Sequence, residues 1–328
     1  MTNSISNQYS STIVIVGAGQ LGSRYLQGLA LSERSLDIYV QDISDQSLRT
    51  SKNLWDQAID ADSIKRHKVT LLSSLENFPQ QIDIAIVSTN ANVRPQVVKQ
   101  IVKNCNVRYW ILEKILAQSE ATLDEISLLT RNSNGVWINH PFRMMNIFRI
   151  MRKNLLKDAP LIVRVSGSLW GMACNTTHYL DLVEFLTGET LTELDISQLD
   201  SHWIKSKRKG FFEVTGKITT AFSRGTTLIL ESRKKGPVFS VEIESQDQKW
   251  KIDDRNRIVS GVNGVLITGN IEMQSLMTKR LVDTLLTGGN CHLPKLSESL
   301  ELHRFFLRSL LEHWNYSHGT NIDTLPIT

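Results

Sequence analysis

The sequence predicts two successive domains: an α/β domain built on a doubly wound parallel sheet, and an α+β domain with an open, mostly antiparallel sheet. Three observations support this prediction. The chain has 328 residues, which is longer than one simple core usually accommodates. Its first part alternates short apolar runs with helical patterns. Its second part places several strands close together, with short turns between them.

The first domain, residues 1–135, is predicted from the regular alternation of strand and helix. Its strands are continuous apolar runs, as expected when a parallel sheet is buried on both faces. The expected strands cover residues 12–16, 36–40, 69–72, 82–87 and 109–112, and a sixth follows at 136–139. The expected helices cover residues 20–31, 45–58, 93–103 and 119–132.

The second domain, residues 136–328, is predicted from closely spaced strands, which are typical of an antiparallel sheet. An open sheet leaves one face exposed, and we expect that face to form a homodimer or homotetramer interface. The expected strands cover residues 161–170, 211–222, 226–232, 238–245, 248–253 and 257–262. Helices are expected near 144–155, 176–187, 271–287 and 297–314.

Composition excludes several classes of protein. A net charge of +4 does not indicate a nucleic-acid or anionic-membrane partner. No run approaches the roughly 18 apolar residues of a membrane span. The first residues, MTNSISNQYSS, lack the pattern of a secretory signal, so we expect a polar tail. Three widely spaced cysteines, Cys105, Cys174 and Cys291, indicate reduced thiols in a cytoplasmic protein, without a disulfide framework or a metal site.

A glycine motif lies between the first expected strand and the first expected helix. Gly17 permits a tight turn, Gly19 lets a pyrophosphate approach the backbone, and Gly22 lets the helix pack close to the strand. Gln20 and Leu21 begin the helix, whose free N–H groups favour phosphate. This context predicts a Rossmann-type dinucleotide site. A glycine-rich turn without a nucleotide is the alternative.

Asp42 is expected to select the cofactor. It lies 20 residues after Gly22, at the end of the second expected strand, where a carboxylate accepts hydrogen bonds from the ribose hydroxyls. The same carboxylate would repel a 2′-phosphate, and the nearest basic residue downstream is Arg49, too far along to be an obvious partner. The sequence therefore favours NAD over NADP.

Three small polar residues, Ser88, Thr89 and Asn90, follow the fourth expected strand. Ligands in doubly wound sheets bind at the carboxyl ends of the strands, so these residues could line the cofactor crevice. They could equally be an ordinary helix cap before Pro95.

The order of these motifs resembles the glucose–fructose oxidoreductase / inositol dehydrogenase / MocA family. The resemblance runs from Ile13 to about Tyr316 and rests on VGAGQLG, Asp42, STNANVR, LEKILA, NHPFRM and NTTHYLDLVEFLTG. It implies an NAD-binding Rossmann domain followed by a domain for substrate binding and oligomerisation. It also implies hydride transfer between the nicotinamide and a hydroxyl-bearing carbon of a sugar, polyol or nucleotide sugar.

The resemblance gives a role to Glu113 and Lys114. In the family a Glu-Lys-Pro segment ends the fifth strand, and its lysine faces the nicotinamide and the substrate in the cleft between the domains. Here Ile115 replaces the proline. Lys114 would be a catalytic residue, and Glu113 would hold the loop or contact the cofactor. From the residues alone, a charged surface pair at a strand end is the alternative.

The resemblance also makes His178 a catalytic residue that relays the substrate hydroxyl proton. The family usually has an aspartate four residues earlier, but this chain has Cys174, followed by Asn175, which could take over substrate binding. His178 and Asp181 are expected to share a helical face. A hydrogen-bonded core histidine is the alternative for His178, and a small buried residue is the expectation for Cys174.

Further substrate contacts are expected from Asn139 and Arg143, because amide and guanidinium groups can bind hydroxyls or a carboxylate. Asp181, on the helical face of His178, is also expected to bind substrate. His140 is expected to be structural. The run KSKRKG, residues 205–210, reads as a solvated loop, with a lid over the site as the alternative.

The sequence thus leaves three hypotheses. The first is an NAD-dependent dehydrogenase that acts on a sugar-like substrate, with Lys114 and His178 as its catalytic pair. The second is an inactive NAD-binding sensor or regulator, suggested by Cys174. The third is an epimerase or glycosidase that uses bound NAD without net redox.

Overall fold

The computed structural model describes residues 10–155, 159–246, 248–253, 258–262 and 268–328. Most of the expected polar tail, and residue 257 of an expected strand, lie outside the described residues. The chain forms two compact units. The N-terminal unit contains the chain up to Glu113, Ile126–Trp137 and Met273–His292. The C-terminal unit contains Lys114–Glu125, Ile138–Glu272 and the chain from Leu293. A single boundary after residue 135 was the expectation, whereas the chain passes between the units five times.

The N-terminal unit is built on a six-stranded sheet with the order β3-β2-β1-β4-β5-β6. This is the strand order of a Rossmann fold, and the first five strands pair in parallel. The predicted parallel sheet is therefore confirmed. The central β1 is fully buried at Ile13, Val14 and Ile15, as its continuous apolar run requires. The strands are β1 (Ser11–Val16), β2 (Leu36–Gln41), β3 (His67–Leu72), β4 (Gln81–Val87), β5 (Asn106–Leu112) and β6 (Gly135–Ile138).

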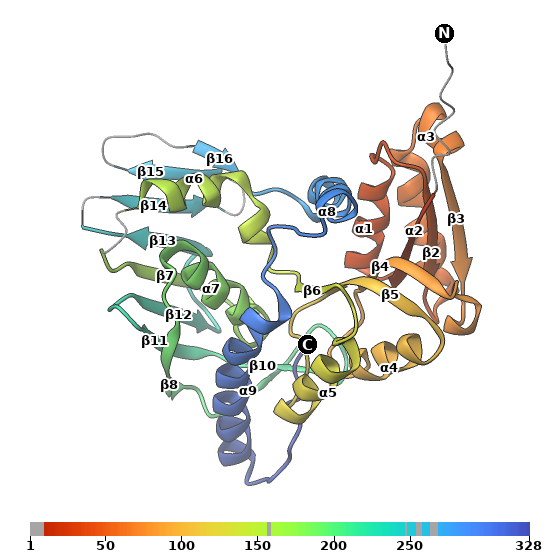
Figure 1. Cartoon of the computed structure of the whole chain (residues 1–328). Coiled ribbons are helices and arrows are strands. Elements are labelled where there is room, and N and C mark those ends of the chain that lie inside the picture. Colours follow the sequence, from red (N-terminus) through yellow and green to blue (C-terminus); the bar gives the residue numbers. More distant parts are fainter. Residues whose placement is uncertain (1–9, 156–158, 247, 254–257, 263–267) are drawn as a thin grey trace. The chain divides into compact units, whose positions relative to one another are not determined.

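Helices cover both faces of this sheet (Figure 1). α1 (Gln20–Leu29) packs against α2 (Asp45–Ala58) on one face, and α4 (Arg94–Asn104) lies on the other. α8 (Gln274–Gly288) returns to the N-terminal unit and packs on α1. Gly28 permits this contact, because a Cβ there would lie 2.3 Å from the Ser275 carbonyl oxygen. The remaining helices are α3 (Ala61–Arg66), η1 (Leu75–Asn77) and α5 (Glu120–Thr130), which spans the boundary between the units.

The C-terminal unit is built on an eight-stranded sheet with the order β16-β15-β14-β13-β7-β12-β11-β8. Only β7 and β12 pair in parallel among these described strands, which confirms the predicted mostly antiparallel sheet. The strands are β7 (Ile162–Ser168), β8 (Leu191–Leu199), β11 (Gly216–Phe222), β12 (Thr227–Arg233), β13 (Ser240–Glu244), β14 (Lys249–Asp253), β15 (Ile258–Val262) and β16 (Thr268–Asn270). A separate hairpin joins β9 (Ile204–Lys205) to β10 (Phe212–Glu213).

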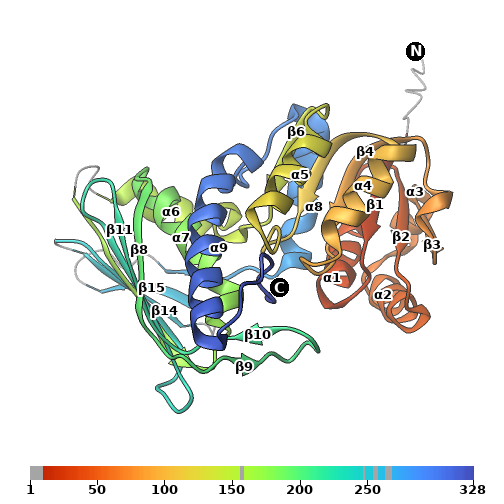
Figure 2. The same cartoon turned by 90° about the horizontal axis from the view of Figure 1, so that it is seen from below.

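One face of this sheet is covered by helices, as Figure 2 shows. They are η2 (Pro141–Met144), α6 (Asn146–Asn154), α7 (Met172–Thr187) and α9 (Leu296–His318). Alternate residues such as Val163, Val165 and Leu230 are buried beneath them. The opposite face carries a shallow hollow of about 810 Å³, lined by Arg164, Lys217 and Glu231 among other residues.

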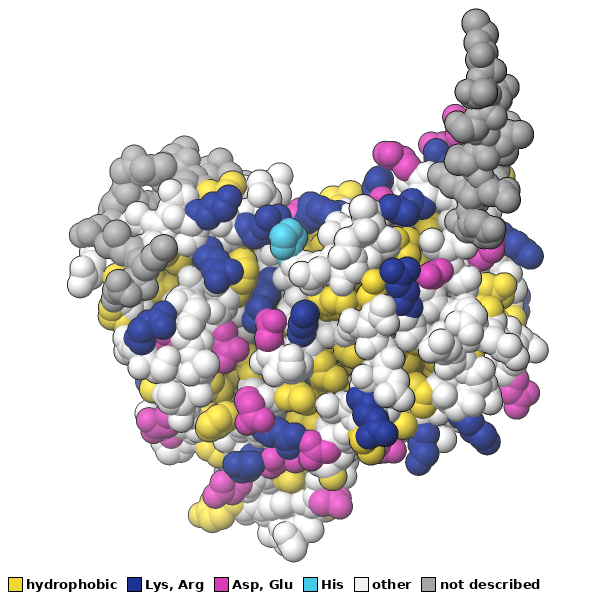
Figure 3. All heavy atoms as spheres, viewed as in Figure 1, with side chains coloured by type: hydrophobic (Ala, Val, Ile, Leu, Met, Phe, Trp, Pro, Cys, Tyr) yellow, Lys and Arg dark blue, Asp and Glu magenta, His cyan; other side chains and the backbone are white. Residues whose placement is uncertain are grey.

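Charged side chains on α9 are paired with those of α5. Arg308 contacts Glu120 at 2.8 Å, and Arg304 pairs with Asp124. In Figure 3 basic and acidic side chains are accordingly mixed over α9.

None of the helices in the described ranges is both long and apolar enough to cross a bilayer.

Two features of the second sheet differ from the sequence expectation. The expected strand 211–222 is divided into β10 and β11 by Val214 and Thr215. Gly216 follows this break with φ of 110°, a conformation that favours glycine. β8 was not expected, because its residues are half-buried or exposed except at Leu191 and give only a weak pattern.

Candidate functional site

The glycine turn after β1 has the geometry of a dinucleotide site. Gly17 has φ of 93°, and a Cβ there would lie 3.1 Å from the Ser88 backbone. A Cβ on Gly22 would lie 1.8 Å from the Gly17 carbonyl oxygen, so only glycine lets α1 pack this closely. A Cβ on Gly19 would meet no atom within 4 Å, so the backbone is open to a ligand there.

The first turn of α1 directly follows the glycine turn, and its backbone N–H groups lie at the start of the helix. Gly19 is the N-cap residue, and no side chain of the described chain caps this helix. The backbone of Gln20 and Leu21 therefore offers free donors at the positive end of the helix dipole. This arrangement fits a diphosphate group.

Asp42 follows β2 and supports the glycine turn. Its Oδ2 accepts a hydrogen bond of 2.7 Å from Ala18 N, and its Oδ1 accepts one of 2.8 Å from Ser44 N. A carboxylate has further lone pairs that can accept ribose hydroxyls. The neighbouring Ile43 is 93% exposed, an unusual state for an isoleucine, and sequence reasoning missed it.

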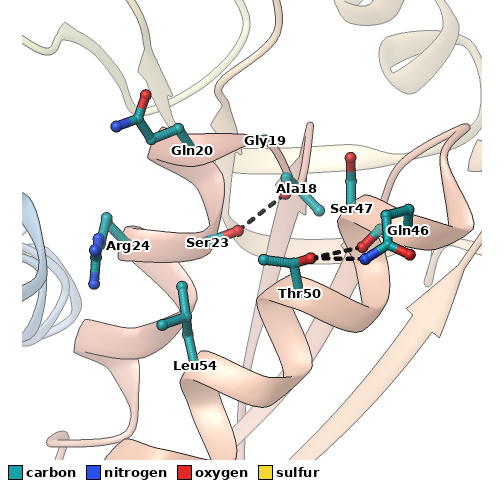
Figure 4. A pocket seen from close by; sticks show the side chains of 9 residues that line it. All are labelled: Ala18, Gly19, Gln20, Ser23, Arg24, Gln46, Ser47, Thr50 and Leu54. Atoms are coloured by element: carbon teal, nitrogen blue, oxygen red, sulfur yellow. Dashed lines mark hydrogen bonds between the residues drawn. The ribbon is translucent and has the colours of Figure 1, made fainter.

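A polar hollow of about 350 Å³ adjoins the glycine turn (Figure 4). Gln20, Ser23 and Arg24 line it from α1, and residues from Gln46 to Leu54 line it from α2. Arg24 donates a hydrogen bond of 2.7 Å to Gln27. The structure thus brings a cation close to the turn from α1, whereas the sequence analysis searched for one only downstream of Asp42.

Ser88, Thr89 and Asn90 follow β4 at the carboxyl edge of the sheet. Ser88 Oγ donates to the carbonyl oxygens of Gly17 at 2.7 Å and Val16 at 3.0 Å, so it holds the glycine turn. The Thr89 hydroxyl is buried without a hydrogen-bond partner. Within the described residues no side chain caps α4, but Pro95 lies in its first turn and the Asn90 carbonyl oxygen accepts a hydrogen bond of 3.1 Å from Arg94 N, so the interpretation as a helix start stays open beside that of a cofactor crevice.

Glu113 is a buried anchor at the end of β5. Its side chain is in the core, with the residue 5% exposed, and Tyr25 of α1 donates a hydrogen bond of 2.6 Å to Oε1. Burial and the adjacent Glu113 raise the pKa of Tyr25 well above its ordinary value. Of the two expected roles for Glu113, this geometry fits holding the loop better than contacting the cofactor.

Lys114 begins a cluster of polar groups in the C-terminal unit. Its Nζ donates to Cys174 O at 2.8 Å, to Asn175 Oδ1 at 3.0 Å and to Cys174 Sγ at 3.3 Å. The Asn175 amide in turn donates to Trp170 O at 3.0 Å. Asn175, expected to bind substrate, therefore positions Lys114. The Lys114–Ile115 peptide bond is cis.

His178 lies one turn after Cys174 on α7, which begins at Met172, earlier than expected. Its Nδ1 is 3.1 Å from the Nδ1 of His140. Burial lowers the pKa of both histidines well below its usual value, with Lys114 adding to the effect on His178. Both imidazoles are therefore neutral near pH 7.

Arg143 and Asp181 bind each other. Arg143 contacts Asp181 through Nε at 3.0 Å and Nη2 at 2.8 Å, and contacts Glu298 through Nη1 at 2.9 Å. Asp181 is 1% exposed, and burial raises its pKa to about 7 although Arg143 opposes the shift. The two side chains that were expected to bind substrate thus bind each other in this structure. Asn139 is also buried, at 3% exposure.

Glu213 of β10 is a site residue that sequence reasoning missed. Its Oε2 accepts hydrogen bonds from the backbone N–H groups of Ala173 at 2.8 Å and Cys174 at 3.4 Å, at the start of α7. Burial raises its pKa to about 7, while these hydrogen bonds and Lys114 oppose the shift. No local motif marks Glu213, because only the β9–β10 hairpin brings it to α7.

Two further expectations concern metals and the basic run. Within the described ranges, no cluster of His, Cys, Asp and Glu side chains could hold a metal ion. Residues 205–210 run from the last residue of β9 into the turn of the β9–β10 hairpin, where Lys207, Arg208 and Lys209 are exposed. This geometry fits a solvated loop.

Comparison with known proteins places the fold. No protein-family model matches the chain, and no curated protein matches its sequence. Solved structures do match. UDP-N-acetylglucosamine 3-dehydrogenase GnnA from Acidithiobacillus ferrooxidans is similar over 93% of this chain and 96% of its own, with a TM-score of 0.65 and 13% identity.

Two other similar structures differ in what they do. An oxidoreductase from Agrobacterium radiobacter, solved with NAD+, L-tartaric acid and magnesium, matches 96% of this chain and 98% of its own, with a TM-score of 0.68 and 12% identity. The transcriptional regulator Gal80p from Kluyveromyces lactis matches 96% and 92%, with a TM-score of 0.67 and 14% identity. The resemblance to the oxidoreductase family is therefore confirmed at the level of fold.

Proposed function

We propose that the protein is an NAD-dependent oxidoreductase that transfers a hydride between the nicotinamide and a hydroxyl-bearing carbon of a sugar, polyol or nucleotide sugar. The observation that carries this proposal is the cluster of Lys114, Cys174 and Asn175, with His178 one turn further along α7. Lys114 directly follows Glu113, at the end of a strand of the Rossmann sheet. The similarity to a nucleotide-sugar dehydrogenase supports the substrate class.

The N-terminal unit supplies the groups that would hold NAD. The backbone at Gly19, Gln20 and Leu21 would bind the diphosphate, because these donors are uncapped and the space at Gly19 is open. Asp42 would accept the ribose hydroxyls, and Ile43 offers an exposed apolar surface for adenine. When bound, NAD accepts or supplies the hydride.

Lys114 and His178 would act on the substrate hydroxyl. An ammonium that donates to the oxygen stabilises negative charge as the O–H proton leaves. A neutral His178 can accept that proton at neutral pH, because its lowered pKa keeps the ring uncharged. Lys114 exchanges one of its present acceptors, Cys174 or Asn175, for the substrate oxygen in this scheme.

The test is a substrate screen that follows the absorbance of reduced nicotinamide. Polyols, sugar acids and UDP-, GDP- and CMP-sugars are offered with NAD and with NADP. Lys114→Met abolishes any true signal, whereas Lys207→Met, at an exposed lysine of the β9–β10 turn, leaves it intact. A signal that survives Lys114→Met would show that it comes from a contaminant or from another mechanism.

A second candidate function is that of a non-catalytic NAD-binding regulator. Two observations favour it: Gal80p shares the fold, and the Lys114 ammonium already has three acceptors. This candidate predicts nucleotide binding without turnover of any substrate. A closed redox cycle, as in an epimerase, instead predicts NAD that co-purifies with the protein and substrate conversion without added cofactor.

We also propose that the open face of the eight-stranded sheet forms a homodimer or homotetramer interface. The support for this proposal is that buried residues alternate with exposed or half-buried ones along β7 and β12, and the exposed ones lie on the face that no helix covers among the described residues. A monomer in analytical ultracentrifugation at micromolar concentration would contradict this assignment.

A further inference from the structure

Three histidines from different elements meet inside the C-terminal unit. The His140 ring centroid lies 5.2 Å from that of His178 and 5.7 Å from that of His303. His140 and His303 have no exposed surface, whereas His178 is partly exposed. A proton exchanged with a ligand must therefore enter this group through His178.

The hydrogen-bond partners determine where the protons lie. His303 Nδ1 is 2.8 Å from the Ser299 carbonyl oxygen, which can only accept, so His303 carries its proton on Nδ1. His140 and His178 meet through Nδ1 and Nδ1 at 3.1 Å. One of these two atoms must donate and the other must accept, so the two neutral rings hold one Nδ1 proton between them.

The charged groups around the pair keep it neutral. Lys114 and Arg143 are the cations that face it, and His303 is the third titratable ring. Arg143 is itself paired with Asp181 and Glu298, which places those carboxylates beyond the guanidinium. Burial, together with positive neighbours, disfavours an imidazolium on either ring.

We propose that His140 is a positioning residue that occupies Nδ1 of His178, so that Nε2 is the one ring nitrogen of His178 able to exchange a proton with a substrate hydroxyl. The exchange of a proton with a substrate hydroxyl rests on the proposed oxidoreductase function, whereas the contact between the two rings does not. When His178 Nδ1 donates to His140, its Nε2 carries a lone pair and can take the hydroxyl proton; the O–H bond breaks, the N–H bond forms and the ring becomes an imidazolium. In the reverse direction the same Nε2–H bond breaks and the proton returns to the substrate oxygen.

The cost of this arrangement falls on His140. Its Nε2 is buried without a hydrogen-bond partner. An unsatisfied buried polar atom is unfavourable, and an apolar residue at position 140 would avoid it. The unsatisfied Nε2 is therefore the structural cost of placing a histidine in contact with His178.

The test needs neither substrate nor cofactor, so its failure differs from a failure of the proposed function. The full chain is labelled with [15N]histidine, and long-range proton–nitrogen spectra report the protonation of each ring nitrogen. Signals of the pair are assigned by their loss in His140→Leu and His178→Gln. The proposal predicts that, at pH 7, one ring of the pair has a protonated Nδ1 and the other does not. Two rings with Nδ1 in the same state would overturn it.

The variants test the positioning role. In the wild type the tautomer of His178 depends on which of the two rings donates; His140→Leu removes this constraint, so the ratio of the two His178 tautomers should change about tenfold. His140→Asn, whose amide can replace Nδ1, should restore the wild-type ratio. An unchanged tautomer ratio in a folded His140→Leu would contradict the proposal. If an active substrate is found, the same variant should lower kcat more than it changes KM, and His140→Asn should recover part of the loss.

Discussion

Arg143→Met is the substitution that most directly tests the buried ion pair beside the candidate site. It removes three charge-assisted hydrogen bonds, two to Asp181 and one to Glu298. It also leaves Asp181, at 1% exposure, without its counterion. Arg143 lies in η2, Asp181 in α7 and Glu298 in α9, so the substitution destabilises the contacts between α7, which carries His178, α9, which carries His303, and η2, which directly follows His140.

The expected loss is roughly 3–5 kcal/mol of unfolding free energy at pH 8, the usual cost of leaving a buried charge unpaired. The loss should be smaller at pH 5. Burial raises the pKa of Asp181 to about 7. Below that pH the carboxyl is protonated, so removal of Arg143 leaves no unpaired negative charge. Each unit of pKa difference corresponds to about 1.4 kcal/mol, which makes the pH dependence measurable.

Thermal unfolding at pH 8 and pH 5 measures both effects. For a unit of this size, 1 kcal/mol moves Tm by about 2–4 °C. Arg143→Met/Asp181→Leu should recover most of the loss, because it removes both charges. Arg208→Met, at an exposed arginine, is the matched control and should change little. An equal loss at both pH values, or no recovery in the double variant, would refute the assignment of a structural ion pair.

Three further predictions follow from the site. Gly22→Ala should abolish NAD binding in calorimetry and destabilise the N-terminal unit, because its Cβ would lie 1.8 Å from Gly17 O; binding within twofold of wild type would contradict the role of the turn. Asp42→Ala should shift the ratio of NAD to NADP affinity at least tenfold towards NADP, and Arg24→Ala in that background should reverse part of the shift if Arg24 contacts the 2′-phosphate. Glu213 has a pKa of about 7 in the folded state, so its contribution to stability is present below its unfolded pKa near 4.5 and is lost as pH rises through 7. The stability advantage of wild type over Glu213→Gln, measured by urea unfolding, should therefore fall by on the order of 1–3 kcal/mol between pH 5 and pH 8, and a flat difference would exclude this titration.

The Rossmann domain was predictable from the sequence because its signals are local. A strand, a turn with Gly17, Gly19 and Gly22, and a helix lie within one short segment, and Asp42 follows at the expected spacing. Both sheets were also predicted in type. The return of α8 to the N-terminal unit was not predictable, because Gly28 reveals its purpose only when Ser275 packs on it.

The candidate catalytic site was predicted less completely. Lys114 and His178 were recognised through their motifs, and the structure places Lys114 against Cys174 and Asn175, one turn before His178. The partners of these residues come from distant parts of the chain. Glu213 lies outside every motif. His140 lies within NHPFRM, but its contact with His178 cannot be read from the sequence, and neither can the contact between Arg143 and Asp181, which were expected to bind substrate.

The central claim, that Lys114 serves chemistry rather than cofactor binding, is tested most directly by one paired measurement. NAD affinity and turnover of the best substrate are determined for wild type, Lys114→Met and Lys207→Met. The account predicts that Lys114→Met binds NAD within about threefold of wild type but loses at least a hundredfold in kcat, with Lys207→Met unchanged. Wild-type turnover in Lys114→Met, with NAD binding intact, would contradict it.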